Sequence, residues 1–252
     1  MTALAGVLGF PVAHSRSPAM MTAAFRELGI DWRYFRLPLP PELFTEAVRA
    51  LPGSGYSGAN VTIPHKLAAL ELAHQATDAA RAIGAANTLT FEDGRIEADN
   101  TDAGGILDAI GHPLPETALV LGAGGAGRAA VWALKEAGVE VAVWNRTPER
   151  AQGLGVRTVE RPERAELVVN ATSVGMAGED AAELLGVREP QVLVELVYGE
   201  EPTRLERWAA ERGARVVDGR EVLVRQGARS LERWTGRPAP VDTMRAALAR
   251  TV

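Results

Sequence analysis

The chain contains the stretch Ala118-Leu-Val-Leu-Gly122-Ala-Gly-Gly-Ala-Gly127, an apolar segment that runs directly into a glycine-rich turn. A segment rich in alanine follows, from Arg128 to Ala137, and its composition predicts a helix. A G-x-G-x-x-G turn between a strand and a helix brings the backbone close to a pyrophosphate. Structural turns also collect glycine, so the strand–turn–helix context carries the argument. We therefore predict a Rossmann-like dinucleotide-binding domain.

The end of the next predicted strand indicates which dinucleotide to expect. This strand ends in Asn145-Arg-Thr147, with Arg150 shortly after, and no carboxylate stands at its end. Proteins that bind NAD usually carry Asp or Glu there, for the ribose hydroxyls. Guanidinium groups can instead hold a 2′-phosphate through charge-assisted hydrogen bonds. Solvated surface arginines are the alternative in this arginine-rich chain, but the position favours NADP as the cofactor.

Predicted strands and helices alternate on both sides of a proline-rich linker, 112–115. Strands are expected at 4–8, 32–37, 56–61, 86–91, 96–98, 118–121, 140–144, 167–170, 192–197 and 215–217. Helices are expected at 18–28, 42–51, 67–73, 101–110, 128–137, 203–212, 222–234 and 243–249. Ser17 is the expected N-cap of the first helix, and Asp93-Gly94 a hairpin turn. Such alternation predicts βαβ crossovers and parallel sheets, hence an α/β fold with two domains.

Composition and charge exclude several classes of protein. The net charge of −5 and the lack of a basic run argue against a nucleic acid or a membrane surface as partner. The chain has no cysteine, so it has neither disulfides nor thiolate metal sites, and its four histidines lack metal-ligand spacing. We expect no metal. The short apolar N-terminal segment is typical of a strand rather than a signal peptide, which predicts a cytoplasmic protein.

Lysine is rare in this chain, which makes the position of Lys66 informative. The only other lysine is Lys135. Lys66 ends the turn-rich segment 58–66, and Asp102 ends a second one, 99–102. An ammonium beside a carboxylate can move a proton at the oxygen of a ketone–alcohol pair, whereas a guanidinium stays protonated. A surface ion pair of little energetic value is the alternative.

Seven segments, in order along nearly the whole chain, resemble motifs of the shikimate dehydrogenase family, NADP-dependent enzymes that reduce 3-dehydroshikimate. They are Gly9–Pro18, Gly58–Lys66, Ile83–Thr88, Asp99–Asp102, Asn145–Thr147, Asn170–Met176 and Val224–Ala228. The resemblance implies that the chain interconverts shikimate and 3-dehydroshikimate by hydride transfer. It also implies a discontinuous substrate-binding domain, residues 1–101 plus 219–252, and an NADP-binding domain, residues 102–218.

The resemblance further implies a role for each matching position. Ser15 and Ser17, with Thr62, would hold the substrate carboxylate, and Lys66 with Asp102 would act on the reacting oxygen. The ring hydroxyls would be bound by Asn60, Asn87, Asp102 and Gln226, with Tyr198 between substrate and cofactor. The NADP-binding positions would be Gly122, Ala123, Gly124, Gly125, Ala126, Gly127, Asn145, Arg146, Thr147, Arg150, Thr172, Leu196 and Gly219.

A few positions depart from the family pattern. Met20-Met21 replaces the usual His-Asn, Glu195 the common Asp, Glu200 a frequent Pro and Val222 the usual Met. None of them belongs to the predicted proton chemistry. A quinate/shikimate dehydrogenase using NAD is the nearest alternative, which the arginine-rich strand end disfavours. A catalytically silent NADP-binding regulator is disfavoured by the presence of Lys66 and Asp102. The expected assembly is a monomer or a homodimer.

Overall fold

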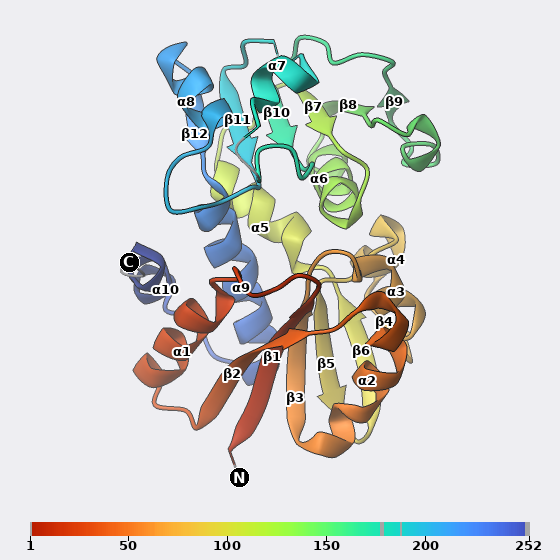
Figure 1. Ribbon diagram of the computed structural model, residues 1–252, viewed down its shortest axis with the longest axis vertical. Helices are drawn as coiled ribbons and strands as arrows, with labels where there is room; N and C mark the ends of the chain where they lie inside the picture. The colour runs from red at the N-terminus through yellow and green to blue at the C-terminus, as the bar shows by residue number, and fades with distance from the viewer. Residues whose placement is uncertain (1, 177–178, 187, 250–252) are drawn as a thin grey trace. The chain divides into compact units, whose positions relative to one another are not determined.

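The structure is a computed structural model that describes residues 2–176, 179–186 and 188–249. The chain divides into two compact units, residues 1–101 with 223–252 and residues 102–222. Among these described residues, each unit contains a sheet of six strands, and the element labels are those of Figure 1. The chain passes from one unit to the other at the start of α5 (Thr101–Ile110) and in the first turn of α9 (Gly219–Thr235).

The first unit contains a mixed sheet in the order β2-β1-β3-β5-β6-β4. Its strands are β1 (Ala3–Gly9), β2 (Trp32–Pro38), β3 (Tyr56–Val61), β4 (Gln75–Ala76), β5 (Thr88–Glu92) and β6 (Arg95–Asp99). β1 is parallel to both β2 and β3, whereas β5 is antiparallel to β3 and β6. Asp93 and Gly94 both have positive φ, 48° and 74°, as a two-residue type I′ hairpin turn requires. Because β1 and β3 are parallel neighbours, their carboxyl ends lie side by side at the same end of the sheet.

Two hydrophobic clusters form the core of the first unit. One lies between the sheet and the helices α1 (Ser17–Glu27), α9 and α10 (Val241–Ala249), and it includes Met20, Met21 and Phe25. The other includes Phe44 of α2 (Phe44–Ala50) and Leu89. A Cβ on Gly227 would lie 2.4 Å from the Cε of Met20, so glycine lets α9 pack closely on α1. The departure Met20-Met21 thus supplies core packing.

The second unit is a fully parallel sheet in the order β12-β11-β10-β7-β8-β9. Its strands are β7 (Thr117–Leu121), β8 (Glu140–Trp144), β9 (Arg157–Thr158), β10 (Leu167–Asn170), β11 (Val192–Glu195) and β12 (Arg215–Val217). Its helices are α5 from Asp102 onward, α6 (Gly125–Glu136), α7 (Ala181–Leu185) and α8 (Arg204–Glu211). Two hydrophobic clusters cover the two faces of the sheet, which explains why the central strands are nearly continuous apolar runs.

The predicted α/β class is confirmed, with several local differences. Ser17 is the first helical residue rather than the N-cap, because Arg16 already has helical φ and ψ, and the prediction for Ser17 was wrong. The helix expected at 42–51 opens with a 3-10 turn, Pro41–Leu43, and α6 begins at Gly125 rather than Arg128. The short helices α3 (Lys66–Glu71), α4 (Asp78–Ile83) and α7 have at most six residues, too few for a clear periodicity. Two of them, α4 and α7, were not predicted.

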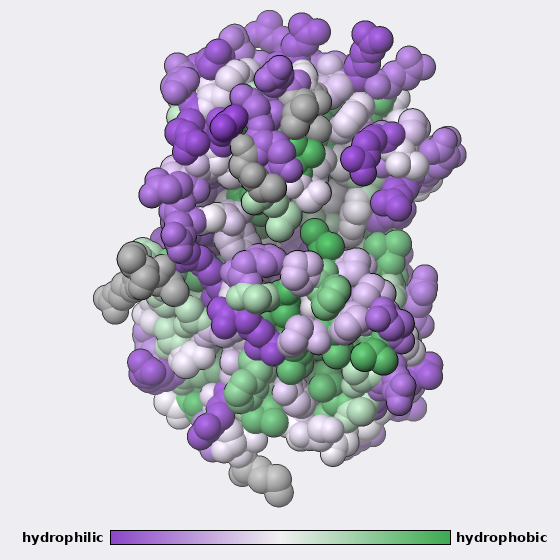
Figure 2. Space-filling model, in the orientation of Figure 1, coloured by the Kyte–Doolittle hydropathy of each residue, from purple (hydrophilic) through white to green (hydrophobic). Residues whose placement is uncertain are grey.

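The surface differs between the two units. On the face drawn in Figure 2, hydrophobic side chains appear mainly over the first unit, whereas the second is largely hydrophilic. The large exposed hydrophobic residues agree with this picture: Phe10, Phe35, Leu43, Ile63 and Leu67 belong to the first unit and Met176 to the second. Among the described residues, no helix is both long and apolar enough to cross a membrane.

Candidate active site

The glycine-rich turn joins β7 to α6, as predicted. Gly122 has a φ of +103°, and a Cβ there would lie 2.9 Å from the carbonyl oxygen of Ala171. A Cβ on Gly127 would lie only 2.0 Å from the carbonyl oxygen of Gly122. By contrast, a Cβ on Gly124, the N-cap of α6, would meet nothing within 4 Å. Two glycines thus shape the turn, and the third leaves open space at a helix N-terminus, where anions bind well.

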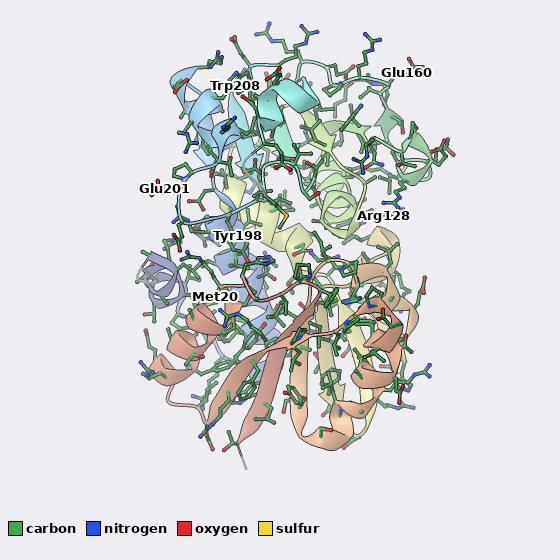
Figure 3. The ribbon with its side chains drawn as sticks, in the orientation of Figure 1. Met20, Arg128, Glu160, Tyr198, Glu201 and Trp208 are labelled. Carbon is green, nitrogen blue, oxygen red and sulfur yellow. The ribbon has the colours of Figure 1, made fainter. Side chains whose placement is uncertain are left out.

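Asn145 ties this turn to the end of the neighbouring strand β8. Its Oδ1 accepts a hydrogen bond from the Ala123 amide at 2.9 Å, and its Nδ2 donates to the Thr147 carbonyl at 2.7 Å. Arg146 and Arg150 are exposed beyond it. Arg128, labelled in Figure 3, donates from Nη2 to the Arg150 carbonyl at 3.3 Å. The side chain of Asn145 therefore holds the arginine-bearing segment next to the glycine-rich turn.

A buried carboxyl group links the ends of β10 and β11. Both oxygens of Glu195 accept from the Nδ2 of Asn170, at 2.9 and 3.0 Å, and Oε1 also accepts from the Val197 amide at 3.0 Å. The Oδ1 of Asn170 in turn accepts from the hydroxyl of Thr172 at 2.7 Å. Burial raises the pKa of Glu195 to about 8, although these hydrogen bonds oppose the shift. The segments that carry Thr172 and Leu196 are thus fixed to each other through Asn170 and Glu195.

Gly219 is the last predicted cofactor position of the second unit, and Tyr198, predicted to lie between substrate and cofactor, belongs to the same unit. A Cβ on Gly219 would lie 2.8 Å from the carbonyl oxygen of Leu196, so α9 can begin there only with glycine. Tyr198 is half-buried in the segment after β11, where Figure 3 labels it. Several predicted cofactor positions therefore follow the carboxyl ends of parallel strands, where nucleotides bind in open α/β sheets.

The serine loop of the first unit is anchored through its backbone. Ser15 and Ser17 are both buried, and the Ser15 hydroxyl accepts from the Ser17 amide at 3.3 Å. Arg36 donates to the Ser15 carbonyl from Nε at 2.9 Å and from Nη2 at 2.7 Å. This arginine was not predicted, because its partner lies 21 positions away. The two serines stand at the start of α1, a favourable place for a carboxylate.

Lys66 is the first residue of α3, directly after a buried structural histidine. The Nε2 of His65 lies 2.7 Å from the Leu39 carbonyl, and its ring stacks on Phe44 with centroids 4.2 Å apart. Burial lowers the pKa of His65, which favours the neutral ring. The Lys66 carbonyl accepts from the Ala86 amide at 2.8 Å, which brings the lysine segment next to Asn87.

Three predicted substrate-binding residues meet in one polar network of the first unit. The Nδ2 of Asn87 donates to the Oε1 of Gln226 at 3.1 Å, and the Nδ2 of Asn60 lies 3.3 Å from the Asn87 carbonyl. These residues come from three distant segments of the chain. The same network contains four buried hydroxyl groups that were not predicted: Tyr34, Thr88, Thr101 and Ser230.

Asp102 directly follows the point where the chain leaves the first unit. Thr101 donates its amide to the Oδ1 of Asn87 at 2.7 Å, and the next residue, Asp102, is buried at the start of α5. Lys66 belongs to one unit and Asp102 to the other, and the pairing of their side chains stays a prediction. Among the residues that the structure describes, no three His, Asp or Glu side chains are grouped so that they could hold a metal ion.

Comparisons with known proteins show what this arrangement is similar to. A family model described as the shikimate dehydrogenase substrate binding domain matches residues 7–89, and one described as the shikimate 5'-dehydrogenase C-terminal domain matches residues 219–249. A shikimate dehydrogenase (NADP(+)) of Anaeromyxobacter dehalogenans (strain 2CP-1) is 44% identical, over 98% of this chain and 96% of that protein. The chain belongs to the shikimate dehydrogenase family.

Solved structures of shikimate dehydrogenases agree with this assignment. The enzyme of Thermus thermophilus, in complex with NADP(H) and shikimate, has a TM-score of 0.91 and 41% identity, covering 99% of this chain and 100% of that one. The enzyme of Listeria monocytogenes, in complex with shikimate and NAD, has a TM-score of 0.81 and 27% identity, covering 98% and 96%. The predictions of family, α/β fold and NADP-dependent oxidoreductase are confirmed.

Proposed function

We propose that the chain catalyses the reversible reduction of 3-dehydroshikimate to shikimate by hydride transfer from NADPH, a step in the biosynthesis of aromatic amino acids. The observation that carries this proposal is the network in which Asn60, Asn87 and Gln226 meet. In this network, amide groups from three distant segments lie together at the end of the sheet where β1 and β3 finish. Amide donors and acceptors suit a ring that carries several hydroxyl groups.

In this proposal Lys66 and Asp102 act on the reacting oxygen. During reduction, the carbonyl carbon receives a hydride and its oxygen receives a proton, so a nearby donor must supply that proton. The Lys66 ammonium can supply that proton or stabilise the developing alkoxide. In the reverse oxidation, the Asp102 carboxylate can take up the proton that the hydroxyl group releases. NADPH supplies the hydride. Ser15, Ser17 and Thr62 bind the substrate carboxylate, which orients the ring for transfer.

The second unit binds the cofactor in this proposal. The glycine-rich turn and the first amides of α6 receive the pyrophosphate, while Arg146 and Arg150 hold the 2′-phosphate. The exposure of both guanidinium groups beside the anchored Asn145 supports this assignment. Thr172, Leu196 and Gly219 border the cofactor, and Tyr198 lies between it and the substrate. The division into a substrate-binding domain and an NADP-binding domain follows from these roles.

A matched set of assays tests the proposal against its nearest alternative. Initial rates are measured with shikimate or quinate, each with NADP or NAD, by the absorbance of the reduced nicotinamide. We expect the highest kcat/KM with shikimate and NADP. A higher value with quinate and NAD would indicate a quinate/shikimate dehydrogenase instead. No turnover with any pair, together with tight NADP binding, would indicate a regulator. We also propose a cytoplasmic location and a monomeric or dimeric state, which fractionation and sedimentation test.

A further inference from the structure

Tyr34 lies on the edge strand β2 and contacts Asn60, one of the predicted substrate-binding residues. Its side chain is buried, and its hydroxyl donates to the Oδ1 of Asn60 at 2.7 Å. The ring is packed against Phe25 and Trp234, with both centroid distances 6.5 Å. The Tyr34 hydroxyl is therefore directed at Asn60 by a ring that has little freedom to move.

Ser230 of α9 contacts the other end of the same amide. The Nδ2 of Asn60 donates to the Ser230 hydroxyl at 2.8 Å. Ser230 itself donates to the carbonyl of Gln226 at 3.1 Å, so its oxygen is left to accept from Asn60. Asn60 thus has a hydroxyl donor at its oxygen and a hydroxyl acceptor at its nitrogen.

These contacts permit only one orientation of the Asn60 amide. The Nδ2 also lies 3.3 Å from the main-chain carbonyl of Asn87. If the amide were reversed, its Oδ1 would face that carbonyl, and two acceptors would oppose each other without a proton between them. Since an amide offers donors on one side and an acceptor on the other, its orientation decides which group of a ligand it can bind.

We propose that Tyr34, together with Ser230, is a positioning residue for substrate recognition. Together with the Asn87 carbonyl, the two hydroxyl groups hold the Asn60 amide in the orientation that meets a ring hydroxyl of the substrate. The inference rests on the proposed role of Asn60 in substrate binding. Tyr34 acts through Asn60, whereas the Ser230 hydroxyl also lies 2.9 Å from that of Thr88 and 3.1 Å from that of Thr101. Neither Tyr34 nor Ser230 takes part in the proton or hydride transfer.

Two conservative variants test this role. Tyr34→Phe keeps the packed ring and removes the donor to Asn60, and Ser230→Ala removes the acceptor. Each should raise the KM for shikimate by roughly 5- to 150-fold, the scale of leaving one buried polar group unpaired. The KM for NADP should change by less than about twofold, and kcat should change less than the KM for shikimate. A merely structural role would lower the melting temperature without separating the two KM values.

Matched controls are available in the same unit. Tyr56→Phe removes a tyrosine hydroxyl from β3 outside the network. Thr235→Ala removes a hydroxyl that donates to the carbonyl four residues earlier on α9, as Ser230 does. Both controls should keep the wild-type KM for shikimate. If Tyr34→Phe and Ser230→Ala behave like their controls, the positioning role is wrong.

Substrate analogues separate this inference from the proposed role of Asn60. The kinetic comparison uses 4-deoxyshikimate and 5-deoxyshikimate, one of which lacks the ring hydroxyl that Asn60 binds. With that analogue, Tyr34→Phe and the wild type should have nearly the same kcat/KM. An equal loss with shikimate and both analogues would overturn the inference. Asn60→Ala should raise the KM for shikimate as well. If it does not, the assignment of Asn60 to the substrate is wrong. If the KM for shikimate rises in Asn60→Ala but not in Tyr34→Phe or Ser230→Ala, only the positioning role is wrong.

Discussion

Alanine substitutions in the glycine-rich turn should separate the glycines that shape the turn from the one that faces the ligand. A Cβ at position 127 would lie 2.0 Å from the carbonyl oxygen of Gly122. That contact is with the main chain, so no side-chain rotation can relieve it. At Gly124, in contrast, a Cβ would meet nothing within 4 Å. The two substitutions therefore have different expected consequences, although the glycines are only three positions apart.

The size of each effect follows from these distances. Overpacking costs about 1–3 kcal/mol, and a backbone contact places Gly127→Ala at the upper end, about 3 kcal/mol. For a chain of this size, about 2–4 °C of melting temperature per kcal/mol predicts a decrease of roughly 6–12 °C. Gly124→Ala changes only an N-cap and should cost less than about 1 kcal/mol. Its methyl group would stand where the pyrophosphate approaches, so the KM for NADP should rise about 10- to 100-fold.

Thermal unfolding and initial rates measure the two effects separately. Gly53→Ala is the control, because its methyl group would also meet nothing within 4 Å but lies in the first unit. It should leave both the melting temperature and the KM for NADP unchanged. A wild-type KM for NADP in Gly124→Ala would refute the assignment of this turn to the pyrophosphate. A wild-type melting temperature in Gly127→Ala would refute the packing argument.

Three further predictions concern single side chains. Lys66→Met should lower kcat by roughly 10²- to 10⁴-fold, the scale of a lost general acid or base, whereas the control Lys135→Met should not. If Lys66→Met keeps more than about half of the wild-type turnover, the assignment is wrong. Arg146→Ala should weaken NADP by roughly 10- to 150-fold and leave the KM for NAD nearly unchanged, since a hydrogen bond to a charged group contributes about 1.5–3 kcal/mol; equal losses with both cofactors would assign Arg146 to the fold. Glu195 has its folded-state pKa raised to about 8, so between about pH 4.5 and 8 the folded chain holds a proton that the unfolded chain releases. Its contribution to stability is complete below that window and is lost as the pH rises through it, by at most about 1.4 kcal/mol per pH unit. Urea unfolding across this range should show that the free energy of unfolding depends less steeply on pH in Glu195→Gln than in the wild type. An identical pH dependence in both would contradict the shift.

Much of the fold could be predicted from the sequence because its signals are local. The strand predicted at 140–144 has its observed bounds, since the apolar stretch there ends at the turn-forming residue Asn145. The glycine spacing of the turn was also readable, because its geometry involves a few consecutive residues. Local reasoning was wrong at Ser17, where the conformation of Arg16 starts the helix one position earlier than expected.

The hydrogen bonds that hold the side chains of the candidate site, by contrast, were decided only by the tertiary structure. Tyr34 contacts Asn60 across 26 positions, and Ser230 contacts it across 170. These residues meet because β1 pairs with both β2 and β3 and because α9 returns to the first unit. A tyrosine in a strand and a serine in a helix have no local sequence signal that identifies such partners. Hydrogen-bond partners depend on where side chains meet in space, and that meeting is set by the packing of the whole unit.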